Sequence, residues 1–311
     1  MLNAVLRRLA TAPLVLLVLV AVTFVLIHAA PGDPFVGERA ADPQAVAALR
    51  KQYRLDRPLP EQFAVYVGNL VCGDFGPSLR NRGQSVGLII ADRLPTSLWL
   101  GAIALVLALG AGLSLGILGA VRAGRALDHG LAVVAIIGVS IPVFVIGPAL
   151  AWTFGLWLGW LPVGQWAGFF GVSHLVLPAT TLAIPFAARV ARLTRAGLLD
   201  TLHLDHVRTA TAKGVAPAAV VVRHALPLGL VPVIAFLGPA SAGLLTGSLV
   251  VEKVFQIPGL GQEFVESAFT RDYPLVLGTV VVYGAIIILG NLLADLAVVM
   301  VDPRVRDGKS L

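Results

Sequence analysis

The 311-residue sequence has little cysteine and little charge. Its one cysteine, Cys72, excludes a disulfide within the chain and a metal cluster built from cysteines. Only 13% of the residues are charged, whereas 57% are hydrophobic and the mean hydropathy is +0.88. A soluble globular domain has about 25% charged residues. We therefore expect lipid to be the main solvent of this chain, and an all-α membrane protein as its fold class.

Long intervals without charge predict the membrane spans. A span needs about 20 apolar residues, because roughly 30 Å of hydrocarbon is crossed at about 1.5 Å per residue. The uncharged interval from Asp128 to Arg189 is too long for one crossing and is interrupted by a polar stretch with Pro and Gly at 160–165, so it should hold two. Six spans are predicted, at 9–30, 96–121, 131–158, 173–192, 226–250 and 275–300. Six crossings place both ends on one side.

Lysine and arginine are spread unevenly over the loops. Short loops rich in these residues face the cytoplasm, whereas long translocated segments are exempt from this rule. The short outer loops hold only Lys253 and Arg271, while the basic residues of 189–223 fall on the same side as those at both ends. Both termini are therefore predicted to be cytoplasmic. The net charge of +6 follows from this topology, since no basic stripe with interleaved aromatic residues indicates nucleic acid.

Residues 31–95 are the one stretch of ordinary amphipathic character and predict a small helical cap on the outer face. Its helix signals predict three short helices, one beginning at Asp42-Pro43, one over 62–71 and one from Ser85 to about Arg93. The expected organisation is a first span within 1–30, the cap at 31–95, and a five-helix membrane core at 96–311 that contains a cytoplasmic hairpin at 200–227.

The hairpin is the most informative segment. Gly214 follows a helical run and precedes Pro217, which predicts a left-handed helix end and then a second helix start. The spacing places four residues along one face of the first helix: Leu202, Val207, Ala210 and Lys213. Such a hairpin is suited to lie flat against a partner protein.

The hairpin resembles the cytoplasmic "EAA" loop of permease subunits of ABC importers, which reads E-A-A-x3-G-x9-I-x-L-P. Ala210 aligns with the second alanine, Gly214 with the glycine, and 224–227 with I-x-L-P. Arg208, Thr209 and His224 depart from the general pattern, and the form Arg-Thr-Ala-x-Ala-Lys-Gly is similar to the peptide and nickel importer branch. The resemblance implies a type I importer permease bundle and an ATPase-coupling loop formed by Arg208, Thr209, Ala210, Lys213, Gly214, His224, Leu226 and Pro227.

Motifs in a shared order extend the resemblance over essentially the whole chain, to the B permease subunits of oligopeptide transporters. They include residues 30–35, 73–78, 238–240, 246–248, 258–262, 271–273 and 302–304. The resemblance implies peptide import across a bacterial inner membrane by a heterodimer with a homologous permease, two cytoplasmic ATPases and an outer peptide-binding protein. ATP and Mg²⁺ would bind to the ATPases, and no cofactor to this chain. Dipeptides, glutathione or a nickel chelate remain alternative substrates.

Charged residues of the outer face are candidates for an outer gate or for contact with the binding protein. They are Glu38, Arg39, Glu252, Arg271 and Asp272. Glu252 lies where the fifth span leaves the membrane, so it could help to form a gate or simply be solvated. Asp295, near the inner end of the last span, is interpreted as structural, because a carboxylate there can reach water or a neighbouring arginine.

The sequence lacks the residues that other classes of function would need. Gly308-Lys309-Ser310 imitates the end of a phosphate-binding loop, but the required earlier glycine would fall at Pro303. No pair of histidines has further metal-ligating residues beside it, and Ser140 and Ser248 have no base as a partner. Neither a metal site nor an enzyme is therefore expected. An ion-coupled carrier would place carboxylates near mid-membrane. A passive channel would leave the hairpin unexplained.

Overall fold

The computed structural model describes residues 2–31, 35, 43–81 and 83–301. No β-strand occurs in these ranges, and their regular structure is helical. The helices of the first half are α1 (Leu2–Ala29), α2 (Pro43–Gln52), α3 (Leu59–Val71), α4 (Val86–Val121), α5 (Ala126–Ser140), α6 (Val143–Leu150) and the π-helix η1 (Ala151–Trp157). Those of the second half are α7 (Val172–Leu202), α8 (Asp205–Ala212), α9 (Pro217–Ala219), the π-helix η2 (Val220–Ala225), α10 (Leu226–Gly229), α11 (Val231–Leu245), α12 (Leu249–Val254), α13 (Leu260–Thr270) and α14 (Tyr273–Val301).

The apolar helices confirm the predicted all-α membrane fold. Within the described ranges, five helices are long and apolar enough to cross a membrane, and the number rises to six if one bent pair counts as a span. That pair is α5 with the α6–η1 segment, and the bend is 104°. The predicted span at 131–158 is therefore sharply bent, and it makes a sixth crossing only if the pair is one span. Pro142 explains the break, because the residue before a proline is driven out of the helical region, and Ile141 is extended at φ −79° and ψ 124°.

The helix α4 joins two elements that the sequence separated. The predicted cap helix from Ser85 and the predicted span from residue 96 form one helix of 36 residues that continues through Pro95. At about 1.5 Å per residue it is about 54 Å long, well beyond the roughly 30 Å of hydrocarbon. One end of α4 must therefore stand outside the membrane. The helix α7 also continues beyond its predicted end, to Leu202.

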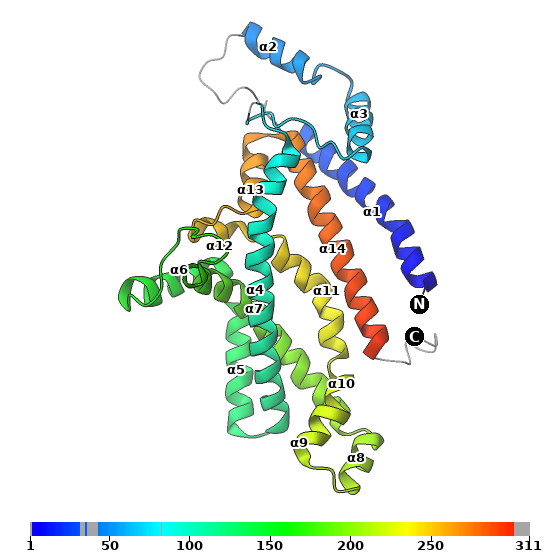
Figure 1. Cartoon of the computed structure of the whole chain (residues 1–311), viewed down its shortest axis with the longest axis vertical. Coiled ribbons are helices and arrows are strands. Elements are labelled where there is room, and N and C mark those ends of the chain that lie inside the picture. The colour runs from blue at the N-terminus through cyan, green and yellow to red at the C-terminus, as the bar shows by residue number, and fades with distance from the viewer. Residues whose placement is uncertain (1, 32–34, 36–42, 82, 302–311) are drawn as a thin grey trace.

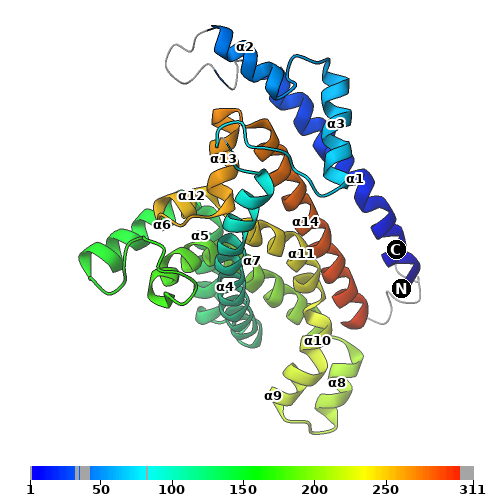
Figure 2. The same ribbon diagram turned by 45° about the horizontal axis from the view of Figure 1, so that its top comes forward.

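The cap and the hairpin lie at opposite ends of the molecule. Figures 1 and 2 show α2, α3 and α13 at one end and α8 and α9 at the other, with the start of α1 and the end of α14 directed away from the cap. Helix α4 packs along α7 in the centre, α11 packs on α14, and α1 lies against α14. The buried side chains between α4, α7, α11 and α12 include Leu100, Leu175, Leu244 and Phe255.

Two glycines bring α4 and α7 into direct backbone contact. A Cβ atom on Gly112 would lie 2.7 Å from the carbonyl oxygen of Ala187, and one on Gly116 would lie 2.6 Å from that of Ala191. The Gly112-x-x-x-Gly116 spacing predicted this close approach.

Replacing Gly116 by leucine is expected to destabilise the α4–α7 contact by about 1–3 kcal/mol, the usual cost of forcing extra atoms into a packed interior. Gly110→Leu is the matched control, since a Cβ there would meet no described atom within 4 Å. Thermal unfolding of the detergent-solubilised protein compares the two variants. Equal midpoints would contradict the tight contact.

Candidate functional site

The hairpin of α8 and α9 turns at Gly214. Gly214 has φ +76°, and its N–H donates to the carbonyl of Thr211 at 3.0 Å. The next N–H, of Val215, donates to the carbonyl of Ala210 at 3.3 Å, which closes the end of α8. Pro217 is the first residue of α9. The predicted left-handed helix end and the predicted start of the second helix are both confirmed.

One face of the hairpin packs firmly on the end of α7. Val207 and Ala210 are buried with Leu198 of α7 and with Ala225 of η2. The segment η2–α10, over 220–229, is the returning limb of the hairpin. Lys213 was predicted on this face but is exposed, because it follows the last residue of α8, where the chain leaves the helical path. The hairpin is thus a packed unit rather than a free loop.

The predicted coupling residues divide into two groups. Four are exposed on the hairpin: Arg208 and Thr209 in α8, Lys213 at its end and Gly214 at the turn; Pro227 is exposed in α10. Ala210 is buried, whereas His224 and Leu226 are half-buried. His206 Nε2 lies 3.1 Å from the carbonyl oxygen of His224 and joins the two limbs. The first group is available to a partner, and the second holds the hairpin together.

The returning limb is clamped to α7 just beyond the hairpin. A Cβ atom on Gly197 would lie 2.2 Å from the carbonyl oxygen of Gly229 in α10. The two backbones therefore touch. The returning chain and α7 are therefore closely packed at this point, where a side chain on either glycine would clash.

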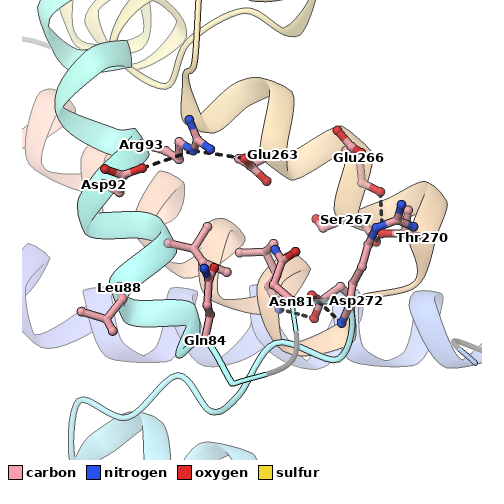
Figure 3. A pocket seen from close by; sticks show the side chains of 13 residues that line it. Asn81, Gln84, Leu88, Asp92, Arg93, Glu263, Glu266, Ser267, Thr270 and Asp272 are labelled. Carbon is pink, nitrogen blue, oxygen red and sulfur yellow. Dashed lines mark hydrogen bonds and ion pairs between the residues drawn. The ribbon is translucent and has the colours of Figure 1, made fainter.

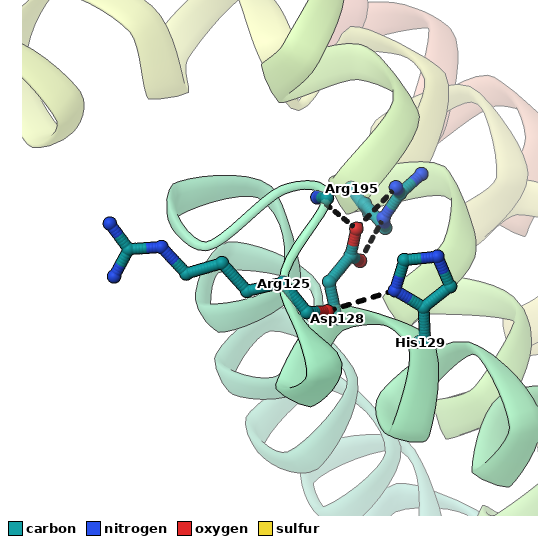
Figure 4. Close-up of polar contacts among 5 residues, drawn as sticks. Arg125, Asp128, His129 and Arg195 are labelled. Carbon is teal, nitrogen blue, oxygen red and sulfur yellow. Dashed lines mark hydrogen bonds and ion pairs between the residues drawn. The ribbon is translucent and has the colours of Figure 1, made fainter.

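An ion pair between a buried carboxylate and a half-buried arginine braces the same end of the bundle. Arg195 of α7 donates from Nε and Nη2 to the two carboxylate oxygens of Asp128, at 2.6 and 2.8 Å (Figure 4). The N–H of Gly124 donates to the same carboxylate at 2.9 Å, and the Asp128 residue is only 3% exposed. The pair ties the turn between α4 and α5 to α7. Sequence reasoning missed it, although Asp128 is the only acid near the arginines of this turn.

Glu252 forms a second buried network, toward the end of the bundle that carries the cap. It is 0% exposed, and its carboxylate accepts hydrogen bonds from the Ser97 hydroxyl at 2.8 Å, from the N–H of Gln262 at 2.8 Å and from that of Gly261. Ser97 in turn accepts the N–H of Leu260 at 2.8 Å. The carboxylate thus caps the amino end of α13, where the helix dipole favours negative charge. The interpretation of Glu252 as a solvated residue is wrong.

Glycines, which have no side chain, make room for this carboxylate. A Cβ on Gly247 would lie 2.2 Å from Glu252 Oε1, and one on Gly259 would lie 2.3 Å from its Cδ. Gly247 has φ +79° and sits in the break between α11 and α12. Glu252 therefore joins three parts of the cap half of the bundle: the broken fifth span, α13 and α4.

Asp272 has an internal role as well. It is 1% exposed and accepts hydrogen bonds from the Ser78 hydroxyl and from the N–H groups of Leu79 and Arg80, the latter two at 3.1 and 3.4 Å. The carboxylate thereby fastens the end of the cap to the start of α14. Its burial leaves it no surface to offer to a docking protein.

The remaining outer candidates differ in what the structure says of them. Arg271 is half-buried, has φ +58°, and donates from Nη2 to the carbonyl oxygen of Pro31 at 2.5 Å. Glu38 and Arg39 lie outside the described residues, so their proposed contact stays a prediction. Asp295 of α14 pairs with Arg8 of α1, which is the neighbouring arginine that the structural interpretation of this carboxylate expected.

A polar cleft of 480 Å³ separates α4 from α13 next to Asp272 (Figure 3). On one side Arg93 Nε lies 3.1 Å from Glu263 and 3.5 Å from Asp92. Burial raises the pKa of Glu263, and the Arg93 charge opposes that shift. The cleft is a further feature of the cap end that sequence reasoning missed, because its walls lie about 170 residues apart along the chain.

The replacement Asp272→Ala is expected to loosen the cap. Each buried donor left without an acceptor costs about 1–3 kcal/mol, so the loop around Arg80 should detach from α14 more often. Limited trypsin digestion of the purified protein measures this as faster cleavage after Arg80, which is exposed. Asp92→Ala is the control, because the Asp92 side chain is 74% exposed. Equal cleavage rates would show that Asp272 does not hold the cap.

Comparison with known proteins agrees with this architecture. Residues 112–307 match the family described as binding-protein-dependent transport system inner membrane component, and residues 1–101 match its N-terminal family. The chain is 40% identical over 306 residues to the oligopeptide transport system permease protein OppB of Haemophilus influenzae, covering 98% of this chain and 100% of that protein. It is 39% identical to OppB of Escherichia coli with the same coverage, and 40% identical over 291 residues to the dipeptide permease DppB of Bacillus subtilis, covering 94% of each.

Solved structures share the fold at lower identity. The inward-facing MetNI methionine ABC transporter matches with a TM-score of 0.56 and 20% identity, over 69% of this chain and 97% of the matched chain. An amino acid ABC transporter matches with a TM-score of 0.51 and 17% identity, over 67% and 92%. At these identities they show the fold alone. With the two family matches and the full-length relatives, they lead to one conclusion: this chain belongs to the binding-protein-dependent transport system inner membrane components, the permease subunits of ABC importers.

Proposed function

We propose that the chain is a permease subunit of an ATP-driven importer that moves oligopeptides into the cytoplasm. The observation that carries the proposal is the packed hairpin, whose exposed residues Arg208, Thr209 and Lys213 lie at the end of α7 opposite the cap. A rigid surface of this kind can receive a motor protein and pass its movement to α7 and α11. Permeases of oligopeptide transport systems are among the full-length relatives, which supports peptide as the substrate.

The proposed complex contains a homologous second permease, two cytoplasmic ATPases and an outer peptide-binding protein. ATP and Mg²⁺ bind to the ATPases, and this chain binds no cofactor and performs no covalent chemistry. Peptide passes between the two permeases. The outer charged residues Glu38, Arg39, Glu252 and Arg271 contribute to the gate or to the binding-protein contact, directly or by holding the outer segments in place.

Uptake of labelled peptides by proteoliposomes that contain the complete complex tests the proposal. ATP-dependent accumulation of peptides of three or more residues is the expected result. The relative from Bacillus subtilis is named as a dipeptide permease, so dipeptides are the second candidate substrate. A preference for dipeptides would replace the oligopeptide proposal, and absence of any ATP-dependent peptide uptake would refute it.

The proposal places the cap on the outer face and the hairpin with both termini in the cytoplasm of a bacterial inner membrane. Cys72, the only cysteine, is exposed at the end of α3 in the cap. A membrane-impermeant thiol reagent is therefore expected to label intact cells or spheroplasts, and a Cys72→Ser variant should give no label. Labelling only after the inner face is opened would reverse the topology.

A further inference from the structure

An apolar groove runs between α5 and the α4–α7 pair. Its volume is 680 Å³, within the range of about 300–1,000 Å³ that is typical of small-molecule sites. Small side chains and glycines form most of its walls, among them Gly116, Gly119 and Ala132. Val134 and Ile136 on its α5 wall are 57% and 55% exposed, so the groove is open to its surroundings.

Three arginines of α7 line this groove, and they differ in their partners. Arg195 is held by Asp128, and the Arg189 guanidinium lies over the ring of Phe236, 5.6 Å from its centroid. Arg192 is exposed and has no partner among the residues that the structure describes. It lies one helical turn from Arg195, at the same end as the brace to Asp128. A free guanidinium therefore stands at the charged end of an apolar groove.

The charge around this end of the groove is mostly positive. The segments that form the groove, 111–138 and 184–196, contain five arginines and one acid, Asp128, whose carboxylate is already bonded. A peptide would find no free carboxylate for its ammonium group here. A helix of another protein would cover the apolar walls but leave the Arg192 charge without an anion. An occupant that fits needs an apolar chain and an anionic head.

We propose that this groove binds an anionic phospholipid of the cytoplasmic leaflet, with an acyl chain along the α4–α5–α7 walls and the phosphate at Arg192. Basic pockets between membrane helices on the cytoplasmic side are suited to anionic head groups. Arginine matches phosphate with paired N–H donors and keeps its charge in an apolar environment. The leaflet rests on the topology of the proposed function, but the site itself does not depend on the transported substrate.

Lipid retention by the complete complex tests the site. The complex is purified from nanodiscs of phosphatidylcholine that contain a minor fraction of phosphatidylglycerol, and the retained lipid is quantified by mass spectrometry. The wild type is expected to retain phosphatidylglycerol above its share in the nanodisc. Arg192→Gln should lower this retention about fivefold, which corresponds to about 1 kcal/mol per basic side chain at an anionic surface. The matched control is Arg223→Gln, an exposed arginine of η2 that does not line the groove.

A second pair of variants tests the apolar part. Ala132→Phe fills the groove and should displace retained phospholipid, whereas Val133→Phe adds the same bulk at a neighbouring exposed position outside it. Glycerol 3-phosphate, added as a free head group, should not compete, because it lacks the acyl chain. Retention that is unchanged in Arg192→Gln, or lowered equally in Arg223→Gln, would overturn the proposal. Peptide uptake is measured separately, so failure of the lipid site and failure of the proposed function give different results.

Discussion

Replacing Glu252 by alanine is expected to destabilise the protein by about 3 kcal/mol or more. The substitution leaves the Ser97 hydroxyl and the N–H groups of Gly261 and Gln262 buried without an acceptor, and each such group costs about 1–3 kcal/mol. The space vacated by the carboxylate adds a cavity. A lower unfolding midpoint of the purified protein and a lower membrane level are the expected measurements, with loss of uptake as a consequence.

The matched control for this substitution is Glu266→Ala, which removes the same side chain from an exposed position on the neighbouring helix α13. Gly259→Ala provides an independent test, because its Cβ would lie 2.3 Å from the Glu252 Cδ and would push the carboxylate out of place. If Glu252→Ala and Glu266→Ala unfold at the same midpoint, the buried network does not hold the cap half of the bundle together.

The burial of Glu252 could not be predicted from its own surroundings in the sequence. A glutamate at the end of an apolar run normally reaches water at the membrane edge. Its first partner, Ser97, lies 155 residues away in α4, and no local rule joins the two. The nearby glycines at 247, 259 and 261 can be recognised as a signal only once the structure is known. These three positions without side chains leave room for a buried carboxylate.

The hairpin and the spans could be predicted because their signals are local. Charge-free runs set the spans, and the order of Gly214 and Pro217 set the turn of the hairpin. The size of the bend in the third predicted span, 104°, could not be predicted, since a proline indicates a kink but not its angle. The Asp128–Arg195 ion pair could not be predicted for the same reason as the burial of Glu252, because its two side chains lie 67 residues apart.

Gly214→Val is expected to block peptide uptake while the protein still inserts into the membrane. A Cβ at this position would meet no described atom within 4 Å, so there is space for the larger side chain. The obstacle is φ +76°, which a β-branched residue tolerates poorly. The strain is of order 1–3 kcal/mol, small beside the burial of the spans. It is large for a docking surface, because the same energy corresponds to about 5- to 150-fold in affinity.

The controls separate backbone strain from loss of a contact. Gly214→Asn adds a side chain but keeps a residue that visits the left-handed region, so it should retain uptake and ATPase co-purification. The valine variant should reach the membrane at the wild-type level, lose the ATPase on purification and fail to import peptide. Normal uptake by the valine variant would refute the coupling role. Equal impairment of the asparagine and valine variants would instead mean that the partner contacts the bare glycine surface. Backbone strain at φ +76° differs between asparagine and valine, whereas either side chain would obstruct such a contact.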